Sequence, residues 1–235
     1  MKNDVTIQRE YYERTSVNFD KMHLHAGDAH ELALSAFSGL VHRFPHESFL
    51  DVGAGTGRAI SFLTQRFPNS RVVGIEPSPA QRAQAYAKGI AQNALIEGDA
   101  LDLPFKDDEF DWVVETGVLH HIKNFPKAVT EMCRVARQGV MISDSNNLAQ
   151  GTGLAKFVKS RIKAAGLWPL AVFIQTRGKG YKESEGDGVF YSFCAFDCVD
   201  LVKVKFPTIH YMNTEAADFR LDRSAGHVMI LARKA

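Results

Sequence analysis

The sequence predicts an α/β fold with a doubly wound, mostly parallel seven-stranded sheet and an antiparallel final strand. Short runs rich in β-branched residues alternate with helix-length segments between residues 48 and 144, and this alternation favours parallel strands joined by crossover helices. The last two strand-like runs, roughly 208–215 and 227–234, are separated by the short stretch RLDRSAG. That connection suits a hairpin better than a crossover, so one of these strands is expected to run antiparallel.

The individual elements follow in chain order. A helix is expected over 28–44, because Asp28 and Glu31 can cap it, an apolar stripe follows at helical spacing, and Pro45 ends it. The expected strands are SFLDVG (48–53), RVVGIE (71–76), ALIEGD (94–99), FDWVVE (110–115) and GVMISD (139–144). Further helices are expected near 57–66, 79–89, 125–136 and 197–205.

The composition limits the class of protein. The 235 residues are 45% hydrophobic and 23% charged with a formal net charge of +1, which favours one soluble domain over a generally basic nucleic-acid binder. The N-terminus lacks the apolar core of a signal peptide, and no segment approaches the roughly 18 apolar residues of a membrane span, so stable membrane insertion is not expected. Three cysteines are too few for a disulfide framework, and Cys194 and Cys198 have no second pair to complete a zinc site. A cytoplasmic protein without a metal site is predicted.

The stretch LDVGAGTG (50–57) follows the first predicted strand and places three glycines before a helix. A glycine-rich turn at this position is where such folds bind nucleotide-like ligands. Gly53 and Gly55 match the first two glycines of the nicotinamide fingerprint, but the sixth position is Arg58, and the third glycine, Gly57, comes one residue early. The spacing argues against a dinucleotide and favours a cofactor without a pyrophosphate.

The chain resembles the class I S-adenosylmethionine-dependent methyltransferases, because this stretch is similar to their motif I and further motifs follow in order. These are VVGIEPSP, IEGDALDLPF and FDWVVETGVLHHI, and the ending GHVMILARKA is similar to the family's final strand. The resemblance covers roughly residues 48–144 firmly and 196–235 loosely. It implies the Rossmann-like methyltransferase fold, S-adenosylmethionine as cofactor and a substrate cap.

The resemblance also implies cofactor-binding residues. Glu76 would accept hydrogen bonds from both ribose hydroxyls, Asp99 would bind the adenine amino group, and the amide of Ala100 would meet a ring nitrogen. The complete implied set is Asp51, Gly53, Ala54, Gly55, Gly57, Glu76, Pro77, Asp99, Ala100, Glu115 and Thr116.

His120 and His121 are the predicted catalytic residues. The family pattern places the VLHHI segment near the methyl group, and an imidazole with an ordinary pKa of about 6.5 can accept a proton at neutral pH. A base of this kind suits a hydroxyl acceptor. The alternative is that one of the two histidines only packs or holds the loop.

Residues 1–47 are expected to form a helical lid over the cofactor, as in related enzymes. Tyr12 is a predicted substrate contact in an aromatic wall with Tyr11 and Phe19, and His25 is a second predicted contact. The nearby histidines and Asp28 match no metal-site spacing. The remaining divisions of this single domain are a cofactor-binding core (48–144), an inserted basic substrate cap (145–195) and a C-terminal helix with a strand pair (196–235).

The inserted cap holds seven basic residues and no acid between Ser145 and Lys182. Its first part is predicted as an amphipathic helix with apolar and basic faces. Lys156 and Arg177 are predicted to draw in an anionic acceptor; a helix with a solvated basic face and a membrane-surface helix are the alternatives. The stretch GKGYKESEGDG (178–188) is expected to be a mobile loop that orders as a lid.

The predicted function is methyl transfer from S-adenosylmethionine to a small acceptor, most simply at oxygen. A tRNA or RNA methyltransferase is the first alternative and a nicotinamide-dependent oxidoreductase the second. A non-catalytic binding module is disfavoured by the intact Asp51, Glu76 and Asp99 set. The sequence does not indicate an oligomeric state.

Overall fold

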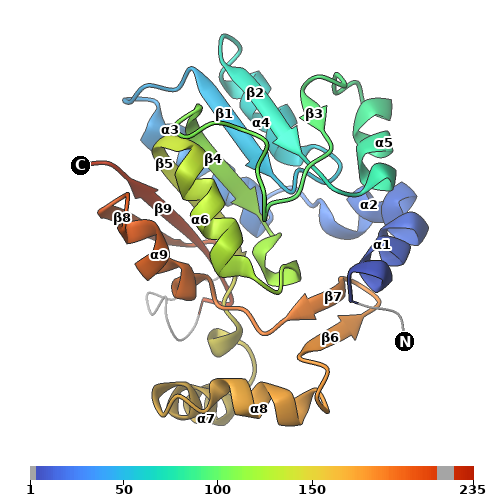
Figure 1. Cartoon of the computed structure of the whole chain (residues 1–235), viewed down its shortest axis with the longest axis vertical. Helices are drawn as coiled ribbons and strands as arrows, with labels where there is room; N and C mark the ends of the chain where they lie inside the picture. Colours follow the sequence, from blue (N-terminus) through green and yellow to red (C-terminus); the bar gives the residue numbers. More distant parts are fainter. Residues whose placement is uncertain (1–3, 216–224) are drawn as a thin grey trace.

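The computed structural model describes residues 4–215 and 225–235. Its main element is a seven-stranded sheet in the order β3-β2-β1-β4-β5-β9-β8 (Figure 1). The strands are β1 (Ser48–Val52), β2 (Arg71–Ile75), β3 (Leu95–Ile96), β4 (Phe110–Thr116), β5 (Ala136–Ser145), β8 (Thr208–Asn213) and β9 (His227–Arg233). The predicted doubly wound α/β fold is confirmed.

The strand directions agree with the prediction. Strands β1 to β5 are parallel to one another. Strand β9 is antiparallel to both β5 and β8. The final strand is therefore the antiparallel one. Most of the connection predicted as a hairpin lies outside the described residues, since 216–224 are not among them.

Two elements are shorter than predicted. The strand expected over 94–99 is only Leu95–Ile96, because the chain leaves the sheet and Asp99 instead forms an isolated bridge with Asp102. The helix expected over 197–205 is split into a 3-10 turn, Ala195–Cys198, and the short α9, Val199–Lys203.

Helices cover both faces of the sheet. Side chains of α3 (Ala29–Val41), α4 (Arg58–Arg66) and α5 (Pro79–Ala87) pack in one hydrophobic cluster. Those of α6 (Phe125–Val135) and α9 pack in the other. The predicted cap of α3 is confirmed, because the Asp28 carboxylate accepts hydrogen bonds from the amides of His30 and Glu31.

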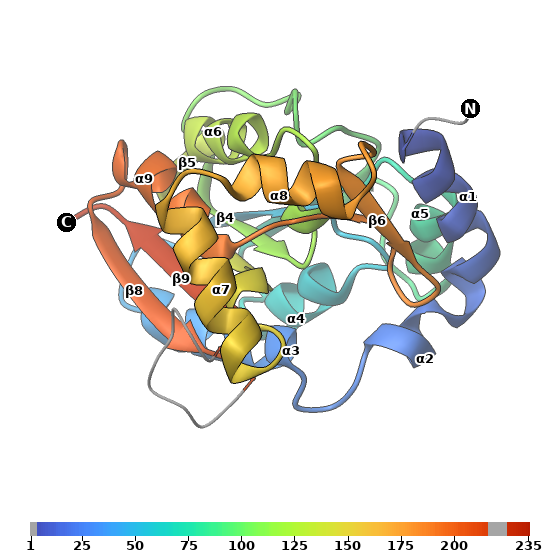
Figure 2. The ribbon, with the colours of Figure 1, turned by 90° about the horizontal axis from the view of Figure 1, so that it is seen from below.

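The N-terminal helices α1 (Asp4–Thr15) and α2 (Phe19–His23) lie beyond the carboxyl ends of the parallel strands (Figure 1). The insertion after β5 forms α7 (Gly153–Ala164), α8 (Trp168–Gln175) and a hairpin of β6 (Tyr181–Ser184) and β7 (Gly188–Tyr191). Figure 2 shows α7 and α8 across the underside of the molecule.

The stretch 178–188, which was expected to be a mobile loop, instead contains strand β6 and the turn of a β-hairpin. Residues 181–184 pair with 188–191, and the turn between them is tight. Gly188 has φ +70°, a conformation that glycine adopts without strain. Tyr181 and Tyr191, which are paired across the two strands, hold their rings 6.3 Å apart.

The division into lid, core, cap and C-terminal strands stays a prediction. In the part of the chain that the structure describes, no helix combines the length and the apolar character needed to cross a bilayer.

Candidate active site

A cavity of about 870 Å³ lies at the edge of the sheet where the parallel strands end. The loops after β1, β2 and β4 and the residues after β3 form one side of it. Its other walls come from α1 and α2, from residues 120–124, and from the β6–β7 hairpin. Doubly wound folds bind ligands at this edge, and the volume suits a cofactor together with a small molecule.

The three glycines of the first loop all have positive φ: +73° at Gly53, +54° at Gly55 and +87° at Gly57. A Cβ at Gly53 would lie 2.5 Å from a methyl group of Val118, and one at Gly57 would collide with Ile90. A Cβ at Gly55 would meet no protein atom within 4 Å, and Gly55 lines the cavity. Gly53 and Gly57 are thus required by packing, whereas Gly55 keeps its space free for a ligand.

Glu76 lines the cavity after β2 and fixes the same loop. One carboxylate oxygen accepts the amide of Gly55 at 3.0 Å and the other accepts the amide of Ser78 at 2.7 Å. Burial raises the pKa of Glu76 to about 7. Burial also raises the pKa of Asp51 to about 7, and the nearby Glu76 adds to that shift. The charge of Glu76 therefore acts on Asp51 beneath the glycine loop.

Several buried polar atoms around the cavity have no hydrogen-bond partner among the described residues. They are both carboxylate oxygens of Asp51, both amide atoms of Gln81, Nε2 of His23 and the hydroxyl of Tyr11. All but Asp51 belong to residues that line the cavity. Buried polar atoms without a partner are costly, so this set fits a polar ligand with several donors and acceptors, as S-adenosylmethionine has. Gln81, on the first turn of α5, was missed by the sequence analysis and carries no motif that would have revealed it.

The other predicted cofactor residues divide into two groups. Ala54, Pro77, Asp99, Ala100 and Thr116 line the cavity, while Asp51, Gly57 and Glu115 do not. Asp99 also accepts the amide of Leu101 at 2.9 Å.

Glu115 is fully buried and is not among the residues that line the cavity. Its carboxylate accepts the amides of Val118 and Leu119, and burial raises its pKa well above the ordinary value. Through these hydrogen bonds Glu115 holds the 3-10 turn Leu119–His121 (η2) that carries both predicted catalytic histidines. The contact with the methionine moiety that the family resemblance implies stays a prediction.

His120 is held between two carboxylates. Its Nδ1 lies 2.7 Å from Asp144 at the end of β5, and its Nε2 lies 3.3 Å from Asp187 at the turn of the hairpin. Burial alone would lower the pKa of His120, but the two carboxylates outweigh burial and raise the pKa well above its ordinary value. The two carboxylates therefore favour the protonated form of His120, whereas an imidazole with an ordinary pKa was expected from the sequence.

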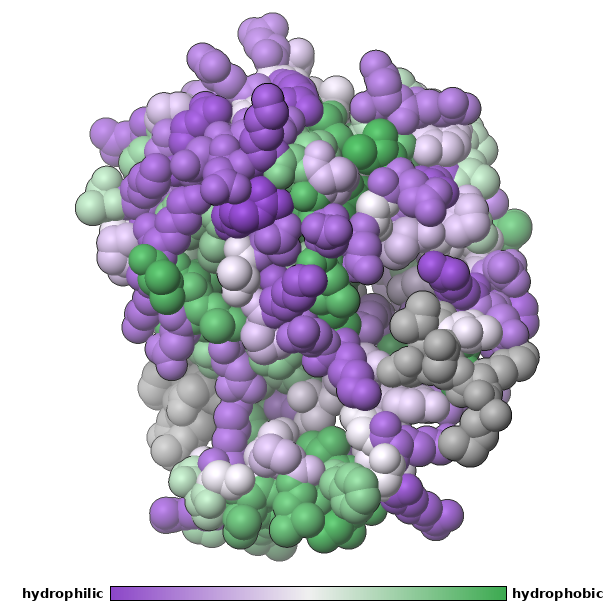
Figure 3. All heavy atoms as spheres, in the orientation of Figure 1, coloured by the Kyte–Doolittle hydropathy of each residue, from purple (hydrophilic) through white to green (hydrophobic). Residues whose placement is uncertain are grey.

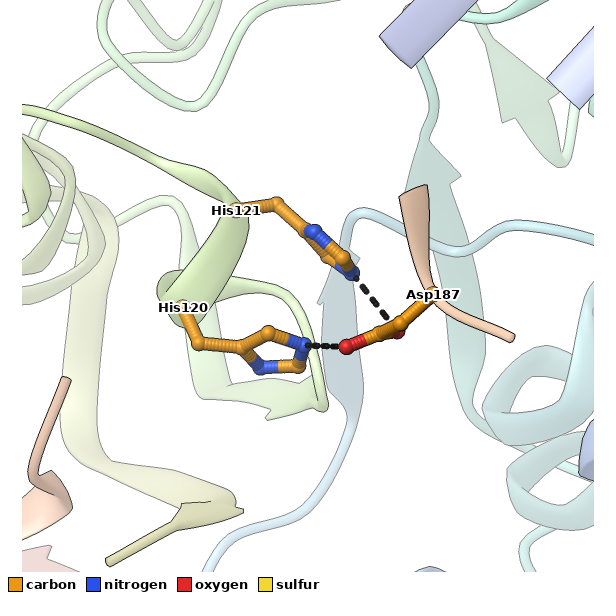
Figure 4. Close-up of side chains that lie close together, drawn as sticks. All are labelled: His120, His121 and Asp187. Atoms are coloured by element: carbon orange, nitrogen blue, oxygen red, sulfur yellow. Dashed lines mark ion pairs between the residues drawn. The ribbon is translucent and has the colours of Figure 1, made fainter. Parts of the chain in front are cut away.

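His121 contacts the same hairpin. Its Nδ1 lies 2.6 Å from the carbonyl oxygen of Val189 and its Nε2 lies 3.4 Å from Asp187. Figure 4 shows both imidazole rings facing Asp187 from the 3-10 turn. Burial would raise the pKa of Asp187, but the two histidines hold it below its usual range.

His120, His121 and Asp187 also form a group with metal-ligand chemistry, since one ligand atom from each lies within 4.8 Å of the others. A divalent cation there would require Nε2 of His120 to be free of a proton, and the carboxylates around His120 favour its protonated form.

Asp144 and Asp187 were not among the predicted site residues. Asp144 ends the strand predicted as GVMISD, and an acid at that edge of the sheet was a signal that could have been used. Asp187 lies in the stretch expected to be a loop, where nothing in the sequence indicates its partners.

The N-terminal segment contributes histidines other than the predicted one. Tyr12 lines the cavity as expected, but His25 does not. His25 is exposed in the turn between α2 and α3, where its amide bonds Asp28. His23 and His30 line the cavity instead. Burial lowers the pKa of His30 to about 3, and its Nδ1 lies 3.1 Å from the hydroxyl of Ser143.

Arg58 attaches this segment to the glycine loop. Its guanidinium donates to Asp28 at 2.9 Å and to the carbonyl oxygen of His23 at 2.8 Å. Thr56, two residues earlier, donates to Asp20 at 2.5 Å. Arg58, which stands where the dinucleotide fingerprint has its third glycine, therefore joins the N-terminal wall of the cavity to the glycine loop.

The two basic residues predicted to contact substrate lie elsewhere. Neither Lys156 nor Arg177 lines the cavity; Lys156 is in α7, and Arg177 follows α8 with φ +52°. Helices α7 and α8 lie at the bottom of the molecule in Figure 1, and none of the seven basic residues of the cap lines the cavity. Arg9 and Lys123 are cationic residues that do line it.

Comparison with known proteins places this site in a family. Residues 50–143 match the model of the methyltransferase domain. The chain is 35% identical over 95 residues to a demethylmenaquinone methyltransferase of Roseiflexus sp. strain RS-1, covering 40% of each chain. It is 37% identical over 97 residues to the chloroplastic tocopherol O-methyltransferase of Arabidopsis thaliana, covering 38% of this chain and 27% of that one. It is 32% identical over 99 residues to ajmaline N-methyltransferase of Rauvolfia serpentina, covering 40% and 34%. The chain thus spans less than half the length of these relatives.

A solved structure extends the likeness of fold to the whole chain. Magnesium protoporphyrin IX methyltransferase from Synechocystis PCC 6803, with bound S-adenosylhomocysteine, superimposes with a TM-score of 0.65. The two chains are 17% identical, and the alignment covers 99% of this chain and 100% of the other. At this identity the match establishes the fold.

Proposed function

Because this chain belongs to the class I S-adenosylmethionine-dependent methyltransferases, we propose that it methylates a hydroxyl oxygen of a small molecule. One observation carries the proposal: a single cavity joins the glycine loop, Glu76 and Asp99 at one end to the His120–Asp144 pair at the other. The cavity thus offers a cofactor end and an acceptor end.

At the cofactor end, Glu76 would hold the ribose, Asp99 the adenine amino group, and Gly55 would allow close backbone approach. Gln81 and His23 would supply partners for further polar groups. When bound, S-adenosylmethionine supplies a methyl group already activated on a sulfonium. The work of the chain is then to align the acceptor with that methyl group.

At the acceptor end, Nε2 of His120 would accept the acceptor's proton. The oxygen–methyl bond forms as the sulfur–methyl bond breaks, the electron pair of that bond goes to sulfur, and the hydroxyl proton goes to His120. Asp144 keeps the other ring nitrogen protonated and stabilises the imidazolium that results. Because the two carboxylates favour the protonated form of His120, Nε2 must first be free of its proton and of its contact with Asp187 before it can accept the acceptor's proton.

The finer features of the acceptor belong to the same proposal. The match to the methyltransferase domain removes the nicotinamide alternative. A small molecule is favoured over RNA because α1 and the hairpin meet over the cavity, where Gln8 accepts the amide of Val189 at 2.6 Å. If the acceptor is an anion, Arg9 and Lys123 would meet its charge.

A cytoplasmic location is retained on the ground that all three cysteines are free.

Two measurements test the proposal. A thermal-shift assay is expected to show stabilisation by S-adenosylhomocysteine and none by NAD, because a ligand stabilises only the state that binds it. Transfer of labelled methyl from S-adenosylmethionine to a panel of hydroxyl, amine and carbon acceptors is expected to label the hydroxyl class. Absence of stabilisation by S-adenosylhomocysteine would overturn the cofactor assignment, and label on amines alone would overturn the acceptor assignment.

A further inference from the structure

Helices α7 and α8 present apolar side chains that no part of the described chain covers. Neither helix has a buried residue. Each carries a stripe at positions i, i+3 and i+4, the spacing with which a helix normally packs on a core. The exposed fractions are 76% for Leu154, 58% for Phe157 and 44% for Val158 in α7, and 55% for Leu170, 59% for Phe173 and 67% for Ile174 in α8. Figure 3 shows the resulting apolar surface at the bottom of the molecule.

The segment that carries this apolar surface is strongly basic. Residues 145–182 contain seven lysines and arginines and no acid. Lys163 pairs with Asp197 and Lys179 with Glu183, and Lys159 bonds the carbonyl oxygens of residues 147 and 150. The four remaining cations have no carboxylate partner among the described residues. They are Lys156, Arg161, Arg177 and Lys182.

We propose that α7 and α8 form a docking face for an anionic lipid bilayer. Helices with exposed apolar stripes and flanking lysine and arginine lie in the membrane interface, with the apolar side in the acyl boundary and the cations at the headgroups. Charge decides against a second copy of the chain as the occupant. In a two-fold dimer through this face, the exposed cations without a carboxylate partner among the described residues, Arg161, Arg177 and Lys182, would oppose those of the other copy.

This docking face connects directly to the acceptor end of the cavity. Residues 176–180 alone separate α8 from β6, and the following turn carries Asp187 over His120 and His121. Docking would therefore place the hairpin side of the cavity near the bilayer, where an amphiphilic acceptor could enter. That extension rests on the proposed function, whereas the docking face itself does not.

Vesicle co-sedimentation tests the proposal directly. The full chain is expected to sediment with vesicles of equal parts phosphatidylcholine and phosphatidylglycerol and not with pure phosphatidylcholine. The double variant Leu170→Asp/Phe173→Asp is expected to stay in the supernatant. The double variant Arg161→Ala/Arg177→Ala should lower the partition coefficient by about 25-fold, since each cation near an anionic surface contributes a factor of roughly five.

The matched control is Val204→Asp, which places the same charge on another exposed apolar residue, 89% exposed after α9. This variant should sediment like the unaltered chain. Thermal unfolding of every variant verifies that it is folded. No sedimentation of the unaltered chain with anionic vesicles would overturn the proposal, as would equal sedimentation of the Leu170→Asp/Phe173→Asp variant. Self-association in solution that this same variant abolishes would assign the face to a second copy. Binding of S-adenosylhomocysteine, measured separately, decides the proposed function and leaves this result unaffected.

Discussion

The two ends of the cavity are built in different ways. The cofactor end uses short stretches that each follow one strand: the glycine loop after β1, Glu76 after β2 and Asp99 after β3. The acceptor end uses side chains from α1 and α3, from the turn after β4, from the end of β5 and from the β6–β7 hairpin. Gln8 and Val189, which join two of its walls, are 181 positions apart in the chain.

The comparison shows which structural constraints can be recognised from neighbouring residues in the sequence. At the cofactor end, three alternate positions of one loop have positive φ, a local backbone conformation that favours glycine. At the acceptor end, His120 has its properties only because Asp144 and Asp187 approach it from other elements. The cofactor end should therefore tolerate changes at the acceptor end, and four predictions test that separation.

The largest effect is expected for His120→Ala. Loss of a positioned proton acceptor should lower turnover by on the order of 10²–10⁴-fold, while affinity for S-adenosylhomocysteine stays near that of the unaltered protein. Initial rates and calorimetric titration measure the two quantities. His25→Ala, an exposed histidine outside the cavity, is the control and should change neither. A parallel loss of affinity and rate in His120→Ala would show that the two ends are not separable.

The next largest effect is expected for Glu76→Gln. The amide keeps the shape of the side chain but loses the charge that the ribose hydroxyls would contact, so affinity for S-adenosylhomocysteine should fall roughly 10–100-fold. Glu97→Gln is the control, because Glu97 is exposed at the same end of the sheet and pairs with Arg82. Affinity unchanged by Glu76→Gln would remove this residue from the cofactor end.

The same carboxyl predicts a pH dependence of binding. Ribose hydroxyls donate to the ionised form, and burial raises the pKa of Glu76 to about 7. Affinity for S-adenosylhomocysteine should therefore rise as the pH increases through neutrality, by up to about tenfold per pH unit on the acid side. Titrations across this range measure it, and Glu76→Gln should flatten the profile. A profile that falls with increasing pH would contradict the assignment.

A smaller effect is expected for Asp187→Asn, which changes the acceptor end alone. Without this carboxylate the pKa of His120 should fall, so the rise of kcat/KM with pH should move about one unit toward acid. The sign follows because the neutral imidazole is the active form and Asp187 stabilises the protonated one. Glu183→Gln, on the same hairpin, should leave the profile in place. A shift toward alkaline pH would disprove this role of Asp187.

Most of the fold could be predicted from local patterns. The cap at Asp28, the strands of the core and the antiparallel final strand each follow from residues close together in the sequence. The β6–β7 hairpin could not, because GKGYKESEGDG is polar and glycine-rich, and the hairpin is joined to α1 by the hydrogen bond from the Val189 amide to Gln8.

The candidate site was predictable to a similar extent. Glu76, Asp99, Gly53 and Gly55 line the cavity, whereas Gly57 does not, and the histidine chosen from the N-terminal segment was the exposed one. His23 and His30 reach the cavity because Arg58 and Asp28 fix the turn that carries them. Arg58 and Asp28 are 30 positions apart, and no periodic pattern in the sequence indicates that they pair.

The sequence by itself determined the sheet and the glycine loop, because strand alternation and backbone conformation are set by neighbouring residues. Only the tertiary structure decided the contacts of His120 with Asp144 and Asp187, the closure of the cavity by α1 and the hairpin, and the exposure of α7 and α8. Each of these depends on groups distant in the chain whose electrostatic and packing interactions arise only after folding.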